Sequence, residues 1–318
     1  MIITVTPNPS VDWTLEIPSL TRGLVHRVVG QHQEPSGKGV NVTRALASNN
    51  VPSIAVLPIG GAKGGELAAL LTAEHVDFVP VPISGSVRVN VSLTEPDGTA
   101  TKINTSGPQL SPAEVDRLIA AVVASVDGAT WVVGSGSLPR GVDVNFYARL
   151  GERVRGTGAR FALDSSGPAF TAGLAARPHL TKPNVDELSE AVRRPIATLG
   201  EAVTAGQELV RRGAMSVVVS LGPDGALLVD GTQVVHAEAH VPAPRSTVGA
   251  GDALLAGCLA GGGRGIAALR EAVAWGSAAV QVEGSHVPHI TRAHRDAVQV
   301  HSTVDANRPL QHGASALV

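Results

Sequence analysis

Short apolar segments alternate with helical patterns between about residues 110 and 222, and this alternation limits the possible folds more than any other feature of the chain. Apolar residues recur at helical spacing in residues 111–126 and 144–155. Buried strands are expected at residues 130–137, 160–166, 179–184 and 215–222. Strands separated by helices imply right-handed crossovers, so we expect an α/β fold whose mostly parallel sheet carries helices on both faces.

The first hundred residues depart from this pattern. Residues 11–17 and 24–30 read as short strands, and residues 87–107 alternate around the turn sequence EPDGT, which is typical of a hairpin. We therefore expect a small β-sheet lid, inserted from about 11–36 and 87–107, on a single domain spanning residues 1–300. Its exposed edges favour pairing with a second copy, and hence a homodimer. Residues 301–318 are polar and aperiodic and are expected to be disordered.

Composition excludes several classes of function. The formal net charge is −2 and no long run of Lys or Arg occurs, so nucleic acid is not an expected partner. The single cysteine, Cys258, excludes an internal disulfide and a cysteine-rich zinc site, and its apolar neighbours predict a buried thiol. No basic leader and no apolar stretch of membrane-spanning length is present, so a cytoplasmic protein without membrane contact is expected.

The segment RSTVGAGDALLAG, residues 245–257, carries the strongest chemical signal. Gly249, Ala250 and Gly251 can point successive N–H groups at an anion, and Asp252 follows where a helix begins. A permanently bound phosphate would be repelled by this carboxylate. A phosphoryl group in transit instead needs both an anion hole and a base that takes the proton of the attacking hydroxyl. The competing interpretation is a glycine-rich turn in which Asp252 only caps the helix.

Three further segments are ambiguous when each is taken alone. In EPSGKGVNVTRAL (34–46), Gly37 permits close approach of a ligand, Lys38 can contact an anion and Asn41 can bond a sugar hydroxyl; a plain loop-to-helix junction is the alternative. In TKPNVDEL (181–188), helix capping by Asn184 and Glu187 competes with ordering of hydrated Mg²⁺. In VVVSLGPDGALLV (217–229), a hairpin competes with a nucleotide-pocket wall that includes Ser220 and Gly222.

Taken in order along about residues 1–298, these segments resemble the ribokinase/PfkB family of carbohydrate kinases. The resemblance implies a three-layer α/β/α fold with a lid, Asp252 as catalytic base, and ATP as cosubstrate with Mg²⁺; K⁺ is a further candidate ion. It places Asp12 and Ser137 at the sugar. On the nucleotide side it places Lys182, Asn184, Ser220, Gly222, Gly225 and Thr247, and it assigns Asn184 and Glu187 to magnesium through water.

The closest branch of that family acts on phosphorylated hexoses. Lys38, Arg88 and Arg27 would supply positive charge for the sugar phosphate, and Asn90 would face it from the lid. We expect phosphorylation of fructose 1-phosphate to the 1,6-bisphosphate. Tagatose 6-phosphate and fructose 6-phosphate remain alternative substrates, and a non-catalytic sugar-phosphate-binding regulator is the alternative from another class. Trp275 departs from the family pattern near the expected adenine pocket.

Overall fold

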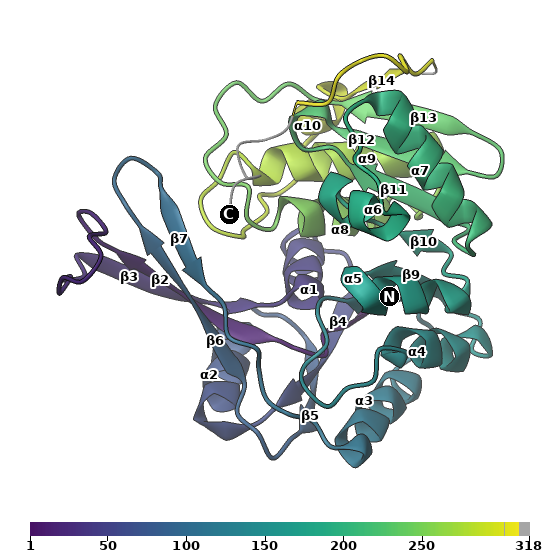
Figure 1. Ribbon diagram of the computed structural model, residues 1–318. Helices are drawn as coiled ribbons and strands as arrows, with labels where there is room; N and C mark the ends of the chain where they lie inside the picture. Colours follow the sequence, from purple (N-terminus) through teal and green to yellow (C-terminus); the bar gives the residue numbers. More distant parts are fainter. Residues whose placement is uncertain (302, 312–318) are drawn as a thin grey trace.

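The computed structural model describes residues 1–301 and 303–311, whose centre is a ten-stranded sheet in the order β14-β13-β12-β11-β10-β9-β8-β1-β4-β5 (Figure 1). The seven neighbouring strands β11-β10-β9-β8-β1-β4-β5 run parallel to one another. Strands β12, β13 and β14 extend this sheet with antiparallel pairing. The parallel strands are β1 (Ile2–Val5), β4 (Ser53–Ile59), β5 (Phe78–Pro82), β8 (Trp131–Ser135), β9 (Arg160–Asp164), β10 (Leu180–Thr181) and β11 (Ser216–Ser220). The others are β12 (Ala226–Asp230), β13 (Val234–Glu238) and β14 (Gln299–His301).

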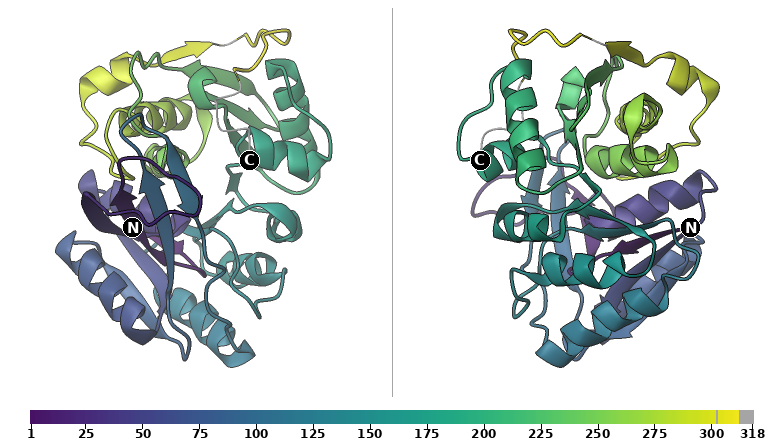
Figure 2. Two further views of the ribbon diagram at one scale, coloured as in Figure 1. Left: turned by 60° about the vertical axis from the view of Figure 1, so that its left-hand side comes forward. Right: turned by 90° about the vertical axis from the view of Figure 1, so that its right-hand side faces the viewer.

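Helices cover both faces of this sheet, which gives the three layers visible in Figure 2. One face buries α3 (Pro112–Ala124), α4 (Phe146–Arg155), α5 (Gly167–Gly173), α6 (Val185–Val192) and α7 (Leu199–Arg211). The other carries α1 (Lys38–Ser48), α2 (Gly61–Ala73), α8 (Ala250–Ala260) and α9 (Gly265–Ala279), with α10 (Arg292–Asp296) against α9. Short 3₁₀ turns are η1 (Leu174–Ala176) and η2 (Gly222–Asp224). The expected α/β fold with helices on both faces is confirmed.

Local sequence explains where several of these helices begin. Helices α3, α6 and α7 each start with a reciprocal capping box, formed by Ser111 with Glu114, Asn184 with Glu187, and Thr198 with Glu201. Each box satisfies backbone N–H groups that have no partner within the helix. The strand ends and helix starts at the carboxyl edge of the sheet are thereby fixed in place.

The second sheet is the expected lid, with strand order β3-β2-β6-β7. Its strands are β2 (Ser10–Glu16), β3 (Gly30–Ser36), β6 (Arg88–Thr94) and β7 (Ala100–Ile103), and they project from the domain at the left of Figure 1. The hairpin expected around EPDGT is present as β6 and β7. The prediction of a strand at 24–30 is wrong, because residues 17–29 form the loop that connects β2 to β3.

The C-terminal segment differs from its sequence-based prediction of disorder. Residues 303–311 run along the start of α7, where Leu199 and Gly200 donate backbone hydrogen bonds to the carbonyls of Arg308 and Ala306. Leu310 is buried against the core and donates to the Ala197 carbonyl. The prediction failed for these residues because their partners lie far away in sequence. Residues 302 and 312–318, to which the same prediction applied, lie outside the described residues.

Two further features bear on the predictions from composition. The Cys258 side chain is buried, as expected, and burial raises the pKa of its thiol to about 12. Within the described part of the chain, no helix combines the length and the apolar character that crossing a membrane requires.

Candidate active site

The polar groups of the candidate site gather where parallel strands end and helices begin. Asp164 is the last residue of β9, and Lys38 is the first residue of α1. Asp252 lies in the first turn of α8, which begins after Gly249. Gly249 has φ +74°, a left-handed conformation that glycine adopts without strain, and this turn aims the first N–H groups of α8 toward the sheet edge. Ligands of open α/β sheets bind at this edge.

Asp252 is 8% exposed and is held by a single side-chain partner. Nδ2 of Asn41 donates to its Oδ2 over 2.8 Å. Burial and the nearby negative charge of Asp164 raise the pKa of Asp252 to about 6, while Lys38 and the Asn41 hydrogen bond oppose that rise. At neutral pH the carboxylate is therefore mostly ionised, yet basic enough to accept a proton from a hydroxyl group.

Asp164 is a site residue that sequence reasoning missed. Its buried Oδ1 lies 3.2 Å from Lys38 Nζ and 3.4 Å from Lys182 Nζ. Burial alone would raise the pKa of this carboxyl, but the two ammonium groups hold it below its usual value. The available signal was its place at the carboxyl end of a buried strand in RFALDSS.

Lys38 joins two carboxylates, because its Nζ also lies 2.9 Å from Glu187 Oε1. Burial would lower the pKa of Lys38, but the surrounding carboxylates raise it well above its usual value, so the ammonium stays charged. Lys38 thus lies beside the carboxylates of the transfer site, and its contact with a sugar phosphate stays a prediction. The same Glu187 uses Oε2 to cap α6, so capping and a site role coexist in one side chain.

The ammonium group of Lys182 lies close to the glycine turn that precedes Asp252. A Cβ atom placed on Gly251 would lie 3.4 Å from Lys182 Nζ, which is buried. The space above Gly251 is thus bordered by an ammonium group and by the first N–H groups of α8. This combination of a fixed positive charge and backbone donors suits a transferring phosphoryl group.

The lid contributes a second polar cluster. Asp12 on β2 lies opposite Asn90 on β6, and Asn90 Nδ2 donates to Asp12 Oδ1 over 2.9 Å. Ser10 Oγ donates to the same oxygen over 2.7 Å. Arg88 lies two residues before Asn90 and donates to the Thr105 carbonyl over 2.9 Å. Ser10, Asp12, Arg88 and Asn90 thus share one face of the lid sheet.

Ser137 is tied to this cluster through Asn8, a residue for which the sequence analysis proposed no role. Asn8 Nδ2 donates to Ser137 Oγ over 3.2 Å and to the Ser106 carbonyl over 3.4 Å. Gly37, the N-cap of α1, has φ +122° and lies against Thr6, so a side chain there would collide. The residues after the carboxyl end of β1, the start of α1 and the base of the lid sheet therefore lie close together.

Many polar atoms around this convergence have no hydrogen-bond partner. The described residues contain eleven buried side-chain N or O atoms without one, and burying such groups is costly unless something completes them. Six of the eleven lie in the clusters just described: Thr6 Oγ1, Asn8 Oδ1, Asn41 Oδ1, Arg88 Nε, Asn90 Oδ1 and Asp164 Oδ2. A seventh, Ser135 Oγ at the end of β8, lies near Gly39 of α1, as does Thr6. Their concentration indicates a ligand-binding site.

The residues predicted for the nucleotide form the next part of the same edge. Ser220 donates a backbone hydrogen bond to Pro183 over 3.0 Å, which joins the end of β11 to the segment that precedes α6. Gly222 and Gly225 both have positive φ in the following turn, and a Cβ on Gly225 would strike the Ala237 carbonyl. Thr247 is exposed in the segment before α8, and its carbonyl accepts a bond from Ala250 N.

Two sequence-based expectations are not met within one chain. Arg27 is exposed in the loop 17–29 at the tip of the lid, beyond the last β2–β3 pair, Glu16 and Gly30, so the structure does not bring it to Lys38 or Arg88. Trp275 was expected near the adenine pocket. Its ring is 2% exposed between α8 and α9 and donates through Nε1 to Glu271, and the cavity that it borders is lined by residues such as His289 and Arg295, not by the turn Gly222–Gly225.

Comparison with known proteins agrees with this geometry. A family model described as pfkB family carbohydrate kinase matches residues 9–292. The chain belongs to this family. This pfkB kinase is 36% identical over 293 residues to a 1-phosphofructokinase of Rhodobacter capsulatus, covering 90% of this chain and 92% of that protein. It is 37% identical to ATP-dependent 6-phosphofructokinase isozyme 2 of Escherichia coli, covering 80% of this chain and 83% of that protein.

Solved structures of similar proteins share the architecture. Phosphofructokinase-2 of Escherichia coli, solved in complex with potassium, superposes on this pfkB kinase with a TM-score of 0.85 at 31% identity, covering 93% of this chain and 96% of that one. A ribokinase of Arabidopsis thaliana, at 23% identity and a TM-score of 0.73, shows the shared fold. The ribokinase-like fold and the expectation of an ATP-dependent sugar kinase are confirmed.

Proposed function

We propose that this pfkB kinase transfers the γ-phosphoryl group of ATP to fructose 1-phosphate, giving fructose 1,6-bisphosphate and ADP. The observation that carries the proposal is Asp252 in the first turn of α8, buried, bonded to Asn41 and raised in pKa to about 6. Relatives named 1-phosphofructokinase in Rhodobacter capsulatus, Bacillus subtilis and Haloferax volcanii, each at 36–37% identity, support this choice of substrate.

In the proposed reaction Asp252 accepts the proton of the sugar hydroxyl while that oxygen attacks the γ-phosphorus. The new bond joins the sugar oxygen to phosphorus, and the bond between the γ-phosphorus and the ADP oxygen breaks. The N–H groups of Gly249, Ala250 and Gly251, with the Lys182 ammonium beside them, stabilise the charge on the transferring group. These groups are positioned before the substrate arrives.

The carboxylates of the site fit a hydrated Mg²⁺. Asp164 Oδ2 is buried without a partner, while both oxygens of Glu187 already have one, Lys38 Nζ and the Asn184 N–H, so Glu187 would meet a hydrated ion through its waters. We assign Mg²⁺ to Asp164 and Glu187, with Asn184 capping the helix that carries Glu187. When bound, the ion offsets the charge of the triphosphate. K⁺ stays a candidate ion, since one solved relative contains it.

On the sugar side, Asp12 and Asn90 are proposed to bind hydroxyl groups, and Arg88 to bind the substrate phosphate. Arg88 keeps a free, buried Nε beside its bond to Thr105, which leaves donors for an anion. Fructose 6-phosphate is the second candidate acceptor, because relatives named 6-phosphofructokinase isozyme 2 reach 37% identity. The same base would serve either sugar.

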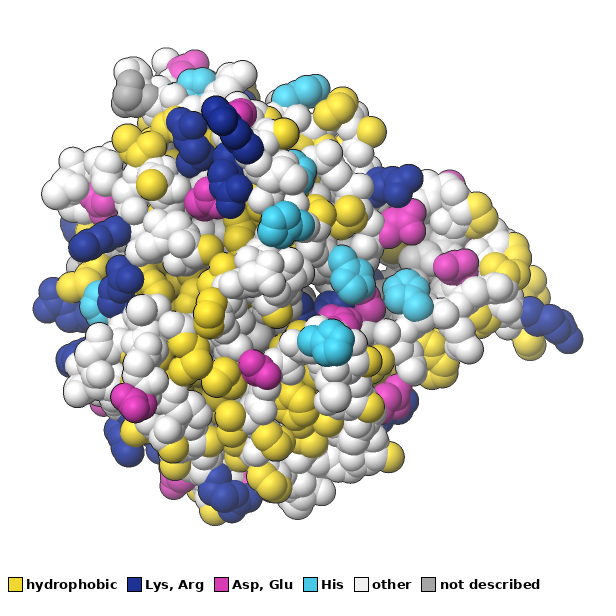
Figure 3. All heavy atoms as spheres, turned by 180° about the vertical axis from the view of Figure 1, so that it is seen from behind, with side chains coloured by type: hydrophobic (Ala, Val, Ile, Leu, Met, Phe, Trp, Pro, Cys, Tyr) yellow, Lys and Arg dark blue, Asp and Glu magenta, His cyan; other side chains and the backbone are white. Residues whose placement is uncertain are grey.

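The proposed enzyme is a cytoplasmic homodimer that pairs through its lid sheets. The lid exposes several large apolar side chains, including Leu24, Val25 and Val29, which are 66%, 88% and 71% exposed. Such a surface is costly in water and favours burial against a second copy. Figure 3, viewed from behind, shows hydrophobic side chains on the projecting lid.

The proposed function is tested by ADP release from Mg-ATP with fructose 1-phosphate, fructose 6-phosphate and tagatose 6-phosphate in parallel. We expect the highest kcat/KM with fructose 1-phosphate, and a loss of several orders of magnitude in kcat in Asp252→Asn with sugar binding kept. Preference for a 6-phosphate would overturn the substrate but keep the base. Near-normal turnover in Asp252→Asn would overturn the mechanism.

A further inference from the structure

The C-terminal segment, residues 303–311, lies beyond the residues that the family model matches, 9–292. It follows β14 in the chain, lies along the start of α7, and reaches η2 in the turn Gly222–Gly225, where Gln311 bonds Asp224. This is the turn to which the nucleotide was assigned above. The segment is therefore placed to act on the ATP side of the site without belonging to the family's motifs.

Both carboxylate oxygens of Asp224 are bound by this segment. Arg308 Nη2 donates to Oδ1 over 2.9 Å, and the Gln311 backbone N–H donates to Oδ2 over 2.6 Å. Asp224 has no exposed surface, so loss of these donors would leave a buried charge without its partners. The turn is thus fastened to the C-terminal segment through one side chain.

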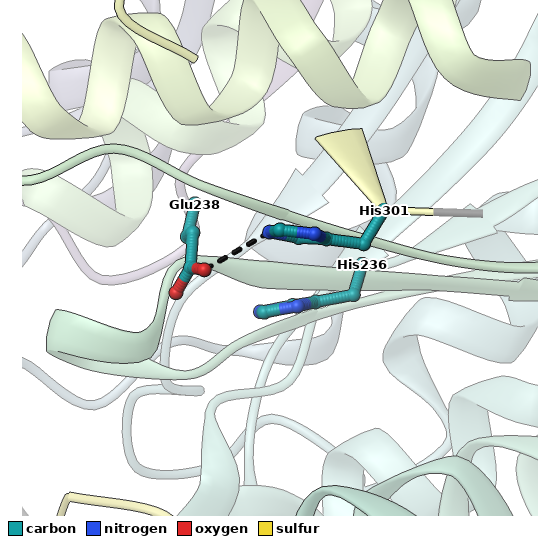
Figure 4. Close-up of side chains that lie close together, drawn as sticks. All are labelled: His236, Glu238 and His301. Carbon is teal, nitrogen blue, oxygen red and sulfur yellow. Dashed lines mark hydrogen bonds and ion pairs between the residues drawn. The ribbon is translucent and has the colours of Figure 1, made fainter. Parts of the chain in front are cut away.

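The Arg308 side chain is oriented by Glu238 on β13, which also bonds His301 on β14. Its two terminal nitrogens bond Glu238, with distances of 2.7 Å to Oε2 and 3.2 Å to Oε1. The His301 ring bonds Glu238 Oε1 over 2.9 Å and stacks on the His236 ring, as Figure 4 shows. The His236 ring in turn bonds the Asp224 carbonyl over 2.7 Å. The turn is held through both its side chain and its backbone.

The same three side chains, His236, Glu238 and His301, offer ligand atoms within 4.8 Å of one another, as a transition-metal site would. Their present bonds favour a different role. Both oxygens of Glu238 already face the positive charge of Arg308, and the His236 ring already bonds a carbonyl. These side chains thus all have hydrogen-bond partners without an ion, so we infer that they hold the turn Gly222–Gly225 in place.

We propose that Arg308 is a positioning residue for ATP: through Asp224 it holds the turn Gly222–Gly225 in the shape that binds the nucleotide. The proposal rests on the proposed function, in which ATP is the phosphoryl donor, and on the prediction that Gly222 and Gly225 lie at the nucleotide. It extends that function by giving the segment beyond the family match a role in nucleotide affinity. The sugar cluster on the lid uses none of these contacts, so its affinity should not depend on Arg308.

The test compares Arg308→Gln and Arg308→Lys with the wild-type chain. Arg295→Gln, which breaks an arginine–glutamate pair with Glu271 on α9, is the matched control. We expect Arg308→Gln to raise KM for ATP at least about tenfold, with kcat and KM for the sugar within about twofold. Arg308→Lys, which retains a positive charge beside Asp224, should recover part of the loss. A chelator selective for transition metals, used with Mg²⁺ in excess, should leave KM for ATP unchanged.

A second readout does not depend on turnover. Hydrogen exchange of the backbone amides in residues 221–226, measured without nucleotide, should be faster in Arg308→Gln and unchanged in Arg295→Gln. Equal KM for ATP in Arg308→Gln and the control would overturn the proposal, as would a joint change of kcat and both KM values. If the wild-type chain fails to use ATP at all, the proposed function falls, while faster exchange would still show the fastening of the turn.

Discussion

Asn41 and Asp252, which lie on α1 and α8, are joined by a hydrogen bond of 2.8 Å from the Asn41 amide to the carboxylate. The predicted contact of Asn41 with a sugar hydroxyl stays a prediction, since its Nδ2 donates to the proposed base while its buried Oδ1 has no partner. The bond stabilises the ionised carboxylate and so lowers the pKa of Asp252, against the rise that burial and Asp164 impose. Asn41 therefore orients the base and opposes part of the rise in its pKa.

This relationship predicts a change in pH dependence. For the wild-type enzyme we expect kcat/KM to fall as pH drops below about 6, because protonated Asp252 cannot accept a proton. Asn41→Ala removes a bond to the charged form, so the pKa of Asp252 should rise and the acidic limb should move to higher pH by about one unit. The measurement is the pH profile of kcat/KM.

The matched control for that experiment is Asn145→Ala. Asn145 donates from Nδ2 to Asp143 over 2.9 Å, an exposed asparagine–aspartate pair at the start of α4. Loss of this bond in Asn145→Ala should leave the pH profile of kcat/KM unchanged. An acidic limb that stays near the wild-type position in Asn41→Ala would show that the bond does not tune the base.

The positions of Lys38 and Arg88 lead to a second prediction, which separates their roles. Removing either positive charge should raise KM for the phosphorylated sugar if both meet its phosphate. Lys38 also lies beside Asp164 and Glu187 and lowers the pKa of Asp252. Lys38→Ala should therefore reduce kcat and shift the acidic limb upward as well, whereas Arg88→Ala should change KM alone.

Steady-state kinetics of both variants at several pH values check this expectation. Lys63→Ala removes a lysine paired with Glu66 on α2 and serves as the control. An unchanged KM for the sugar in both variants would refute the prediction that Lys38 and Arg88 bind the phosphate of the sugar. A KM effect without any change of kcat in Lys38→Ala would show that its carboxylate contacts do not matter for transfer.

His286 and Glu34 connect the lid to the segment beside the glycine turn, and this contact predicts a pH-dependent stability. His286 Nε2 lies 3.2 Å from Glu34 Oε1 on β3, and Ser285 lies against Gly249. The hydrogen bond to Glu34 raises the pKa of His286 above its usual value. A histidine whose pKa is raised on folding stabilises fully below its unfolded pKa and loses that effect as pH rises through its folded pKa.

His286→Gln should therefore destabilise the protein more near pH 5.5 than near pH 8.5. Urea denaturation of the variant and the wild type at both pH values measures the difference. His289→Gln, an exposed histidine in the same segment, is the control. A loss of stability that is equal at the two pH values would mean that the charge of His286 contributes nothing.

Sequence could predict those parts of the site that depend on local features. The capping box at Asn184, the glycine turn before Asp252 and the hairpin around EPDGT are each set by residues a few positions apart. The alternation of strands and helices was enough to predict the layers of the main domain. The lid was predicted from the contrast between its low apolar content and the domain around it.

The rest depends on contacts between distant residues. Asp164 acquires its role from Lys38 and Lys182, which come from other elements, and no local pattern marks it. The C-terminal segment was expected to be disordered because it is polar and aperiodic, whereas ion pairs of Arg308 with Asp224 and Glu238 hold it in place. Trp275 was placed near the nucleotide by position in the chain, while its ring is turned toward α8.

The packing of Trp275 gives the last prediction. A Cβ atom on Gly257 of α8 would lie 2.6 Å from Cγ of Trp275 and 2.6 Å from the Glu271 carbonyl oxygen. The ring fits between α8 and α9 only because residue 257 has no side chain. Gly257→Ala should therefore force the helices apart and lower the free energy of unfolding by roughly 1–3 kcal/mol, despite the better helix propensity of alanine.

Gly65 provides the matched comparison, since it is also a helical glycine, on α2, and a Cβ there would meet no atom within 4 Å. Gly65→Ala should raise the free energy of unfolding by roughly 0.5–1 kcal/mol, because alanine loses less backbone entropy on folding. Urea denaturation with unchanged m values measures both effects. Opposite signs for the two variants are the expected result. A stabilising Gly257→Ala would show that α8 and α9 do not meet as closely as the ring requires.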